Sequence, residues 1–140
     1  MKTHERIVDT MYSNDAFSQW LGIERLEISK GNCRLQMTVR KEMLNGFNIA
    51  HGGITYSLAD SALAFAANTH GNKSLSLETS ISHLAPVKEG DILTAITTEE
   101  SLTGEKGKYL ISIVNQEGKE VASFKGMVHR SSKTWFSENE

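Results

Sequence analysis

One segment of the chain combines groups that could bind a negatively charged oxygen and transfer a proton. A polar loop ends in His51-Gly52-Gly53, and a largely apolar run that contains Asp60 follows. Glycines let the backbone approach a ligand closely. N–H groups at the start of a helix have no partner within the helix and lie at the positive end of its dipole. Such amides, with an acid in apolar surroundings nearby, indicate a catalytic site.

The spacing within this segment limits how its groups could act together. Asp60 follows Gly52 by eight residues, which along one helix means a separation of roughly 12 Å on faces about 80° apart. A reacting carbon needs contacts of about 3 Å, so one chain cannot supply both groups to it. If the two residues act together, the Gly52 amide of one subunit faces Asp60 of another, as two antiparallel helices across a two-fold axis allow. On that condition, the active unit is at least a dimer.

Composition narrows the class of protein. The chain has 140 residues, a formal charge of −2 and a pI of about 6.2, which indicates one domain and no basic field for binding nucleic acid. No signal peptide is seen, and no run of about 18 apolar residues could span a membrane. The single Cys33 excludes an intrachain disulfide and fits a reducing cytosol. We therefore expect a cytoplasmic protein with neither nucleic acid nor membrane as a partner.

The hydrophobic pattern predicts helices at two places and strands elsewhere. Helical spacing predicts one or two short helices over about 5–20, and a run that is apolar on nearly all sides predicts a buried helix over about 52–69. The loop 41–51 precedes that helix, and the polar residues 131–140 are expected to fray. Strands are predicted at 23–28, 33–40, 73–84, 91–100, 107–116 and 119–130.

The order of these elements predicts the architecture. Successive strands without helices between them favour an antiparallel sheet. One long apolar helix needs a sheet to cover it. An α+β fold, with a curved antiparallel sheet wrapped around one central helix, is the simplest arrangement that buries both. We expect it to form a single domain over residues 1–140.

Together with this order, four motifs resemble the hotdog-fold thioesterases, and among them the PaaI-like (phenylacetic acid degradation protein) acyl-CoA thioesterases. The motifs are Leu44-Asn45-Gly46, His51-Gly52-Gly53, Ser57-Leu58-Ala59-Asp60 and Leu84-Ala85-Pro86. The resemblance covers nearly the whole chain. It implies a hotdog fold and hydrolysis of an acyl-CoA to free acid and CoA. The implied substrates are short or medium acyl or aryl-acetyl thioesters, such as phenylacetyl- or hydroxyphenylacetyl-CoA.

The resemblance also implies roles for the residues that match the family's motifs. Asp60 would be the general base or the nucleophile, and the Gly52 amide of the partner subunit would bind the thioester oxygen. Asn45 and His51 would polarise or position the substrate, and Gly53 would line its site. The active unit would be a homodimer, with two such dimers forming a homotetramer.

A further position depends on how the strand after the central helix aligns with the family. A polar residue on the strand after the central helix often helps to place the attacking water. Ser76 is the nearest match, with Ser74 or Thr79 as alternatives if the alignment slips.

The expected chemistry needs neither a metal nor a cofactor. Thioester hydrolysis builds negative charge on the carbonyl oxygen, which an N–H donor at a helix N-terminus stabilises. Apolar surroundings would raise the pKa of Asp60 and make it a stronger base. Attack by water and a route through an anhydride both stay open. The five histidines show no spacing like that of a zinc site.

Each of these features also has a plainer interpretation. Asp60 could be a mid-helix acid that reaches solvent, His51 could only cap the helix, and Asn45 before a glycine could be an ordinary turn residue. The main alternative function is a non-catalytic acyl-CoA-binding hotdog module. A hotdog hydratase or dehydratase fits less well, because those enzymes pair an acid with a histidine in a different pattern.

Overall fold

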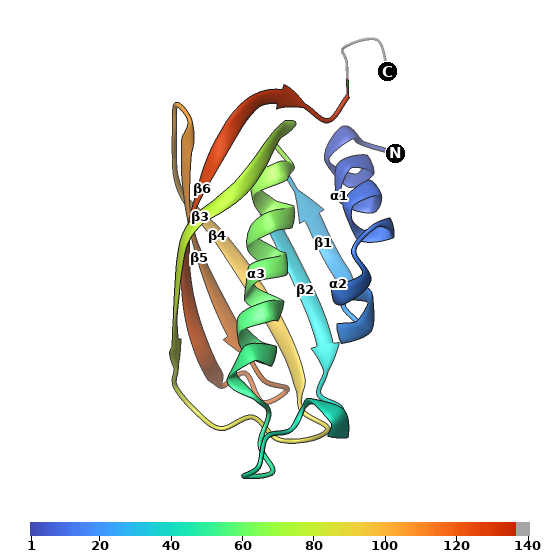
Figure 1. Ribbon diagram of the computed structural model, residues 1–140, viewed down its shortest axis with the longest axis vertical. Coiled ribbons are helices and arrows are strands. Elements are labelled where there is room, and N and C mark those ends of the chain that lie inside the picture. Colours follow the sequence, from blue (N-terminus) through green and yellow to red (C-terminus); the bar gives the residue numbers. More distant parts are fainter. Residues whose placement is uncertain (137–140) are drawn as a thin grey trace.

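The computed structural model describes residues 1–136, which form one curved sheet and three α-helices (Figure 1). In chain order, the elements are α1 (Thr3–Ser13), α2 (Ala16–Leu21), β1 (Glu24–Ser29), β2 (Asn32–Thr38), the 3-10 helix η1 (Lys41–Met43), α3 (Gly52–Asn68), β3 (Asn72–His83), β4 (Ile92–Thr103), β5 (Lys106–Val114) and β6 (Glu120–Thr134).

The six strands pair antiparallel in the order β1-β2-β4-β5-β6-β3. The sheet curls around α3, which lies along its inner face (Figure 1). This arrangement confirms the predicted α+β hotdog fold, with an antiparallel sheet around one central helix. Because β1 and β3 stand at the two ends of the strand order, each has one edge without a partner strand within residues 1–136.

Helix α3 is buried because most of its side chains are apolar and small enough to let the sheet approach. The closest approach is at Gly126 in β6, where an added Cβ would lie 2.5 Å from Leu63 Cδ2. Only one stripe of α3 keeps access to solvent. It includes Gly53, Ser57, Asp60 and Ala64, whose spacing of four, three and four residues puts them on one face of a helix.

The N-terminal helices cover the side of α3 away from β3 (Figure 1). Asp15 begins α2, because its carboxylate accepts a hydrogen bond from Ser18 N at 3.0 Å, and Gly22 ends it in the left-handed conformation at φ 74°. The Ser18 and Ser61 hydroxyls are 2.8 Å apart, which ties α2 to α3.

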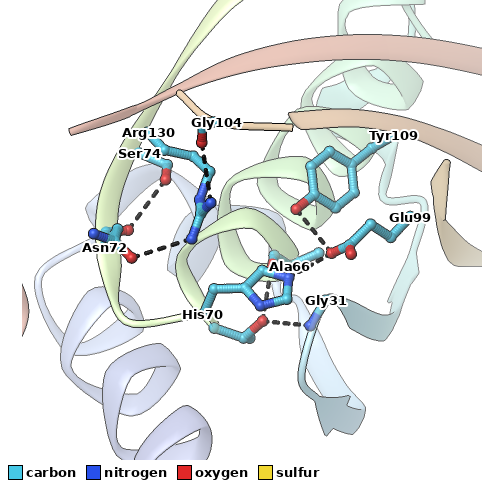
Figure 2. Close-up of polar contacts among 10 residues, drawn as sticks. Gly31, Ala66, His70, Asn72, Ser74, Glu99, Gly104, Tyr109 and Arg130 are labelled. Carbon is cyan, nitrogen blue, oxygen red and sulfur yellow. Dashed lines mark hydrogen bonds and ion pairs between the residues drawn. The ribbon is translucent and has the colours of Figure 1, made fainter. Parts of the chain in front are cut away.

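A polar cluster fixes the C-terminal end of α3 to the sheet (Figure 2). His70 Nε2 and Glu99 Oε2 are 2.5 Å apart, and the Tyr109 hydroxyl donates to the same oxygen at 3.1 Å. Burial, and then the neighbouring Glu99, raise the pKa of Tyr109. Gly31 is required beside this cluster, because it has φ 75° and an added Cβ would overlap the Glu99 carboxylate. The cluster lies at the end of α3 opposite the candidate active site.

The C-terminal segment differs from the expectation of fraying over 131–140. Strand β6 continues to Thr134, Trp135 N donates to Gly71 O at 2.9 Å, and the Trp135 indole N–H donates to Asn68 Oδ1 at 2.9 Å. The expectation was wrong for residues 131–136 because these bonds join positions far apart in sequence. Residues 137–140 lie outside the described part of the chain.

Within residues 1–136, no helix is both long enough and apolar enough to cross a bilayer.

Candidate active site

The start of α3 leaves one backbone amide without a partner. His51 is the N-cap residue, and its Nδ1 accepts a hydrogen bond from Gly53 N at 2.9 Å. The Ile54 amide donates to His51 O at 2.9 Å. Among the residues described, no group accepts from Gly52 N–H. The amide that the sequence singled out is therefore the free one, at the positive end of α3. His51 has the capping role that the plainer interpretation gave it.

Asn45 closes the loop before α3. Its Oδ1 accepts from Phe47 N at 2.8 Å and from Ile49 N at 3.4 Å, so Asn45 also stabilises the turn, as the plainer interpretation held. Its Nδ2 donates to no group within residues 1–136. Asn45 and Gly52 line the same cavity, which has a volume of about 360 Å³. The loop thus places a free side-chain donor in the same cavity as the free amide.

Asp60 lies midway along α3 and is half-buried. Burial raises the pKa of its carboxyl above the ordinary value of 3.8. None of the hydrogen bonds or ion pairs between the described residues involves its carboxylate. An acid that has a raised pKa and makes no hydrogen bond or ion pair is available to act on a ligand.

Asp60 shares a small pocket of about 110 Å³ with Ser76 and Ser74 of β3. Ser74 is buried and its amide is bound by Asn68 Oδ1 at 2.9 Å, whereas Ser76 is exposed. Thr79 does not line the pocket, and its hydroxyl is hydrogen-bonded to the Tyr56 hydroxyl. The structure therefore brings Ser76 and Ser74 to Asp60 and directs Thr79 elsewhere.

The candidate residues of one chain fall into three cavities. Asp60 and Ser76 line one, Asn45 and Gly52 a second, and His51 and Gly53 a third of about 360 Å³. Asp60 lines neither of the cavities at the start of α3. Within one chain, Asp60 and Gly52 therefore line different cavities, as their separation of eight residues along one helix requires.

Two further features of these cavities were not predicted from the sequence pattern. The imidazole of His83 lies close to Gly52: a Cβ added to Gly52 would be 3.2 Å from His83 Cε1 and Nε2. The cavity with His51 and Gly53 is also lined by Phe17 and Trp20 of α2, whose rings stack with centroids 6.0 Å apart. A lone histidine at a strand end and two aromatics on a short helix look ordinary until the fold places them here.

Within the described residues, no three side chains of the kinds that ligate metals come together.

Comparison with known proteins places the chain in a family. A family model of the thioesterase superfamily matches residues 47–122. The acyl-coenzyme A thioesterase PaaI of Escherichia coli K12 is 42% identical over 120 residues, or 86% of this chain and 86% of that protein.

Solved structures agree with that placement. The PaaI protein from the E. coli phenylacetic acid degradation operon superposes with a TM-score of 0.92 at 39% identity, covering 94% of this chain and 96% of that one. A variant of the phenylacetic acid degradation protein PaaI from Thermus thermophilus superposes with a TM-score of 0.81 at 34% identity, covering 84% of this chain and 100% of that one. This chain therefore belongs to the thioesterase superfamily, in its PaaI-like group, and is a thioester hydrolase.

Proposed function

We propose that this protein hydrolyses acyl-CoA thioesters to a free acid and CoA. The observation that carries the proposal is that α3 has both a free amide at its start, Gly52 N–H, and an acid without a hydrogen-bond partner whose pKa is raised, Asp60. Membership in the thioesterase superfamily and the acyl-CoA activity in the name of the E. coli relative support it.

In the proposed reaction, the Gly52 amide stabilises negative charge on the thioester oxygen. Removing such a donor typically slows an enzyme by about 10²–10³-fold. Asp60 either takes a proton from the attacking water or attacks the carbonyl itself to form an anhydride, which water then hydrolyses to the free acid. In both routes the carbon–sulfur bond breaks, and CoA leaves as a thiolate that takes up a proton. Asn45 Nδ2 supplies a further donor, Ser76 places the water beside Asp60, and Gly53 lines the site.

We propose that Asp60 of one subunit and the Gly52 amide of another form one site across a homodimer. Two features support this: the solvent-accessible stripe of α3 contains Asp60, and β3, which carries Ser76, is an edge strand. Leu75 and Leu77 of β3 are 79% and 56% exposed, which is unusual for large apolar side chains in an edge strand without a partner. A two-fold axis beside this strand sets Asp60 of one subunit opposite Gly52 of the other. As in the family, two dimers are proposed to form a homotetramer.

The proposed acyl group is aryl-acetyl, as in phenylacetyl- or hydroxyphenylacetyl-CoA, or short to medium acyl. The names of both PaaI structures refer to phenylacetic acid degradation. The stacked Phe17 and Trp20 beside His51 and Gly53 support an aromatic group, because aromatic rings stack favourably on one another.

A thiol-release assay with a panel of acyl-CoAs tests the proposal. The panel comprises acetyl-, hexanoyl-, lauroyl-, benzoyl-, phenylacetyl- and hydroxyphenylacetyl-CoA, with Asp60→Asn as the control variant. We expect turnover that falls by orders of magnitude in Asp60→Asn, while acyl-CoA affinity is kept. Equal rates in both proteins would remove Asp60 from the reaction. Binding without turnover in the wild type would favour the acyl-CoA-binding module.

The Gly52 amide can be tested separately because Gly52 is the first residue of α3. Proline is tolerated at that position and lacks an N–H, and the preceding His51 has φ −57° and ψ 138°, which suits a residue before proline. Gly52→Ala is the matched control, since it adds the same Cβ and keeps the N–H. A loss of about 10²-fold or more in kcat for Gly52→Pro relative to Gly52→Ala is expected, and equal rates would refute the oxyanion role.

A further inference from the structure

A further cavity adjoins the one that Asn45 and Gly52 line. It has a volume of about 520 Å³ and shares Asn45 and Ile49 with that first cavity, so the two meet along the loop before α3. Its lining also includes Lys41 and Lys88. A ligand whose reacting group lies at Gly52 can therefore extend past Asn45 to two lysines.

The two lysines come from different loops, which hydrogen bonds hold together. Lys41 begins η1, and Lys88 lies in the loop between β3 and β4. Val39 N donates to Asp91 O at 2.9 Å, and Gly90 N donates to Val39 O at 2.8 Å. The Asp91 carboxylate accepts from Lys88 N at 2.8 Å. These bonds fix the two loops against each other, so the lysines line one cavity without help from a ligand.

Both ammonium groups are available to a ligand. Each lysine is exposed, and neither forms an ion pair with any residue of 1–136. The neighbouring Arg40 is engaged instead, because its guanidinium carbon lies 4.9 Å from the centre of a Trp20 ring and its Nη2 donates to Trp20 O at 2.6 Å. One opposing charge, Glu89, lines the cavity with the lysines. The cavity is thus locally basic in a chain whose formal charge is −2.

CoA has groups in an order that matches these two cavities. A long uncharged arm carries its sulfur, and a nucleotide with a pyrophosphate and a 3′-phosphate forms its far end. The cavity at Gly52 has no Asp, Glu, Lys or Arg in its lining, which suits the uncharged arm. The adjoining cavity supplies Lys41 and Lys88. Lysine is a common ligand of phosphate, because its ammonium group is a compact charge with several donors.

We propose that Lys41 and Lys88 bind the phosphates of the CoA nucleotide. This inference rests on the proposed thioesterase function and deepens it by assigning the nucleotide subsite. Since both cavities belong to one chain, the subunit whose Gly52 amide binds the thioester oxygen also binds the nucleotide. The charge on the phosphates does not change as the thioester reacts, so the lysines contribute to KM and not to kcat.

The test compares two substrates that carry the best acyl group of the panel. One is the acyl-CoA, and the other is the acyl-pantetheine thioester, which lacks the nucleotide. Methionine in place of lysine keeps an unbranched side chain and removes the charge. In Lys41→Met and in Lys88→Met, we expect KM for acyl-CoA to rise about 3- to 10-fold, and further in the double variant, with kcat changed by less than about twofold. KM for acyl-pantetheine should not change.

Two other variants serve as controls. Lys106 is exposed at the start of β5 and lines neither cavity, so Lys106→Met should leave KM for acyl-CoA unchanged. Glu89→Gln removes the opposing charge and should lower KM for acyl-CoA, by about twofold. In the wild type, KM for acyl-CoA should also rise more steeply with salt concentration than in the double variant.

An unchanged KM for acyl-CoA in the double variant would overturn the proposal. An equal rise in KM for acyl-CoA and acyl-pantetheine would overturn it as well, because the effect would then not involve the nucleotide. Circular dichroism and thermal melting of each variant separate misfolding from loss of a phosphate ligand.

The failure of this inference differs from failure of the proposed function. If the wild type releases no thiol from any acyl-CoA of the panel, the thioesterase proposal fails. Calorimetric titration with CoA then still decides the role of the lysines. Weaker binding in the double variant than in Lys106→Met supports the nucleotide subsite. Equal affinity in the two variants, or no binding of CoA to the wild type, overturns it.

Discussion

Replacing Gly126 with alanine should push α3 away from β6 at the point where the two pack most closely. The new Cβ would lie 2.5 Å from Leu63 Cδ2 and 2.9 Å from Cδ1, whereas ordinary contact begins at 3.4 Å. Leu63 must therefore move by about 0.9 Å (3.4 − 2.5) or change rotamer. Because Leu63 is 1% exposed, its surroundings leave little room for that movement.

The magnitude follows from two opposing effects. Overpacking a well-packed core costs about 1–3 kcal/mol, and alanine in place of glycine within a strand returns roughly 0.5–1 kcal/mol. A net loss of about 0–2.5 kcal/mol in the free energy of unfolding is therefore expected for Gly126→Ala, near the upper end because the contact is far inside the ordinary distance. Leu63 also lines the pocket that holds Asp60, so kcat should fall as well.

A double-mutant cycle with Leu63→Ala, followed by urea unfolding at a fixed protein concentration, measures the clash directly. Leu63→Ala alone should cost about 2–5 kcal/mol. The double variant should lose less than the sum by roughly 1 kcal/mol, because the clashing atoms are gone. Gly46→Ala is the control, since nothing lies within 4 Å of its Cβ position. Additivity within about 0.5 kcal/mol would refute the reasoning.

The remaining predictions concern Asp60, His51 and the C-terminal segment. Burial raises the folded-state pKa of Asp60 above 3.8. The free energy of unfolding therefore falls as pH rises from 3.8 through the folded-state pKa, because the carboxylate becomes charged in a buried position. In urea titrations at each pH, Asp60→Asn should be more stable than the wild type at pH 7, with no such gain below about pH 3. His51→Ala removes the cap of α3 and should lower the free energy of unfolding, measured by thermal melting, by about 1 kcal/mol. His51→Asn should keep most of that stability, because asparagine is a good N-cap residue. Trp135→Phe loses the hydrogen bond to Asn68 and should cost about 1 kcal/mol in urea unfolding; no change would mean that this bond does not hold the segment.

Local patterns predicted the fold because each rests on physics that acts within a few residues. The apolar circumference of residues 52–69 predicted a buried helix, and α3 spans Gly52–Asn68. Alternation predicted the strands, and their order predicted the antiparallel sheet. The family resemblance drawn from the motifs was confirmed by the comparisons.

Features that depend on contacts distant in sequence were not predictable in this way. His83 reaches Gly52 only because the fold brings the end of β3 to the start of α3. The extension of β6 to Thr134 depends on pairing with β3 and on the bond between Trp135 and Asn68. No periodicity along the chain encodes either contact, because both are set by the sheet topology.

The most direct test of the account is complementation between two inactive subunits. Asp60→Asn and Gly52→Pro chains carrying different affinity tags are co-expressed, and the mixed dimers are isolated and assayed for thiol release. If each site takes Asp60 from one subunit and the Gly52 amide from the other, one site of a mixed dimer has both defects and the other has neither. The account predicts a rate per mixed dimer of about half that of the wild-type dimer. A rate as low as those of the two parent homodimers would contradict a site shared between subunits.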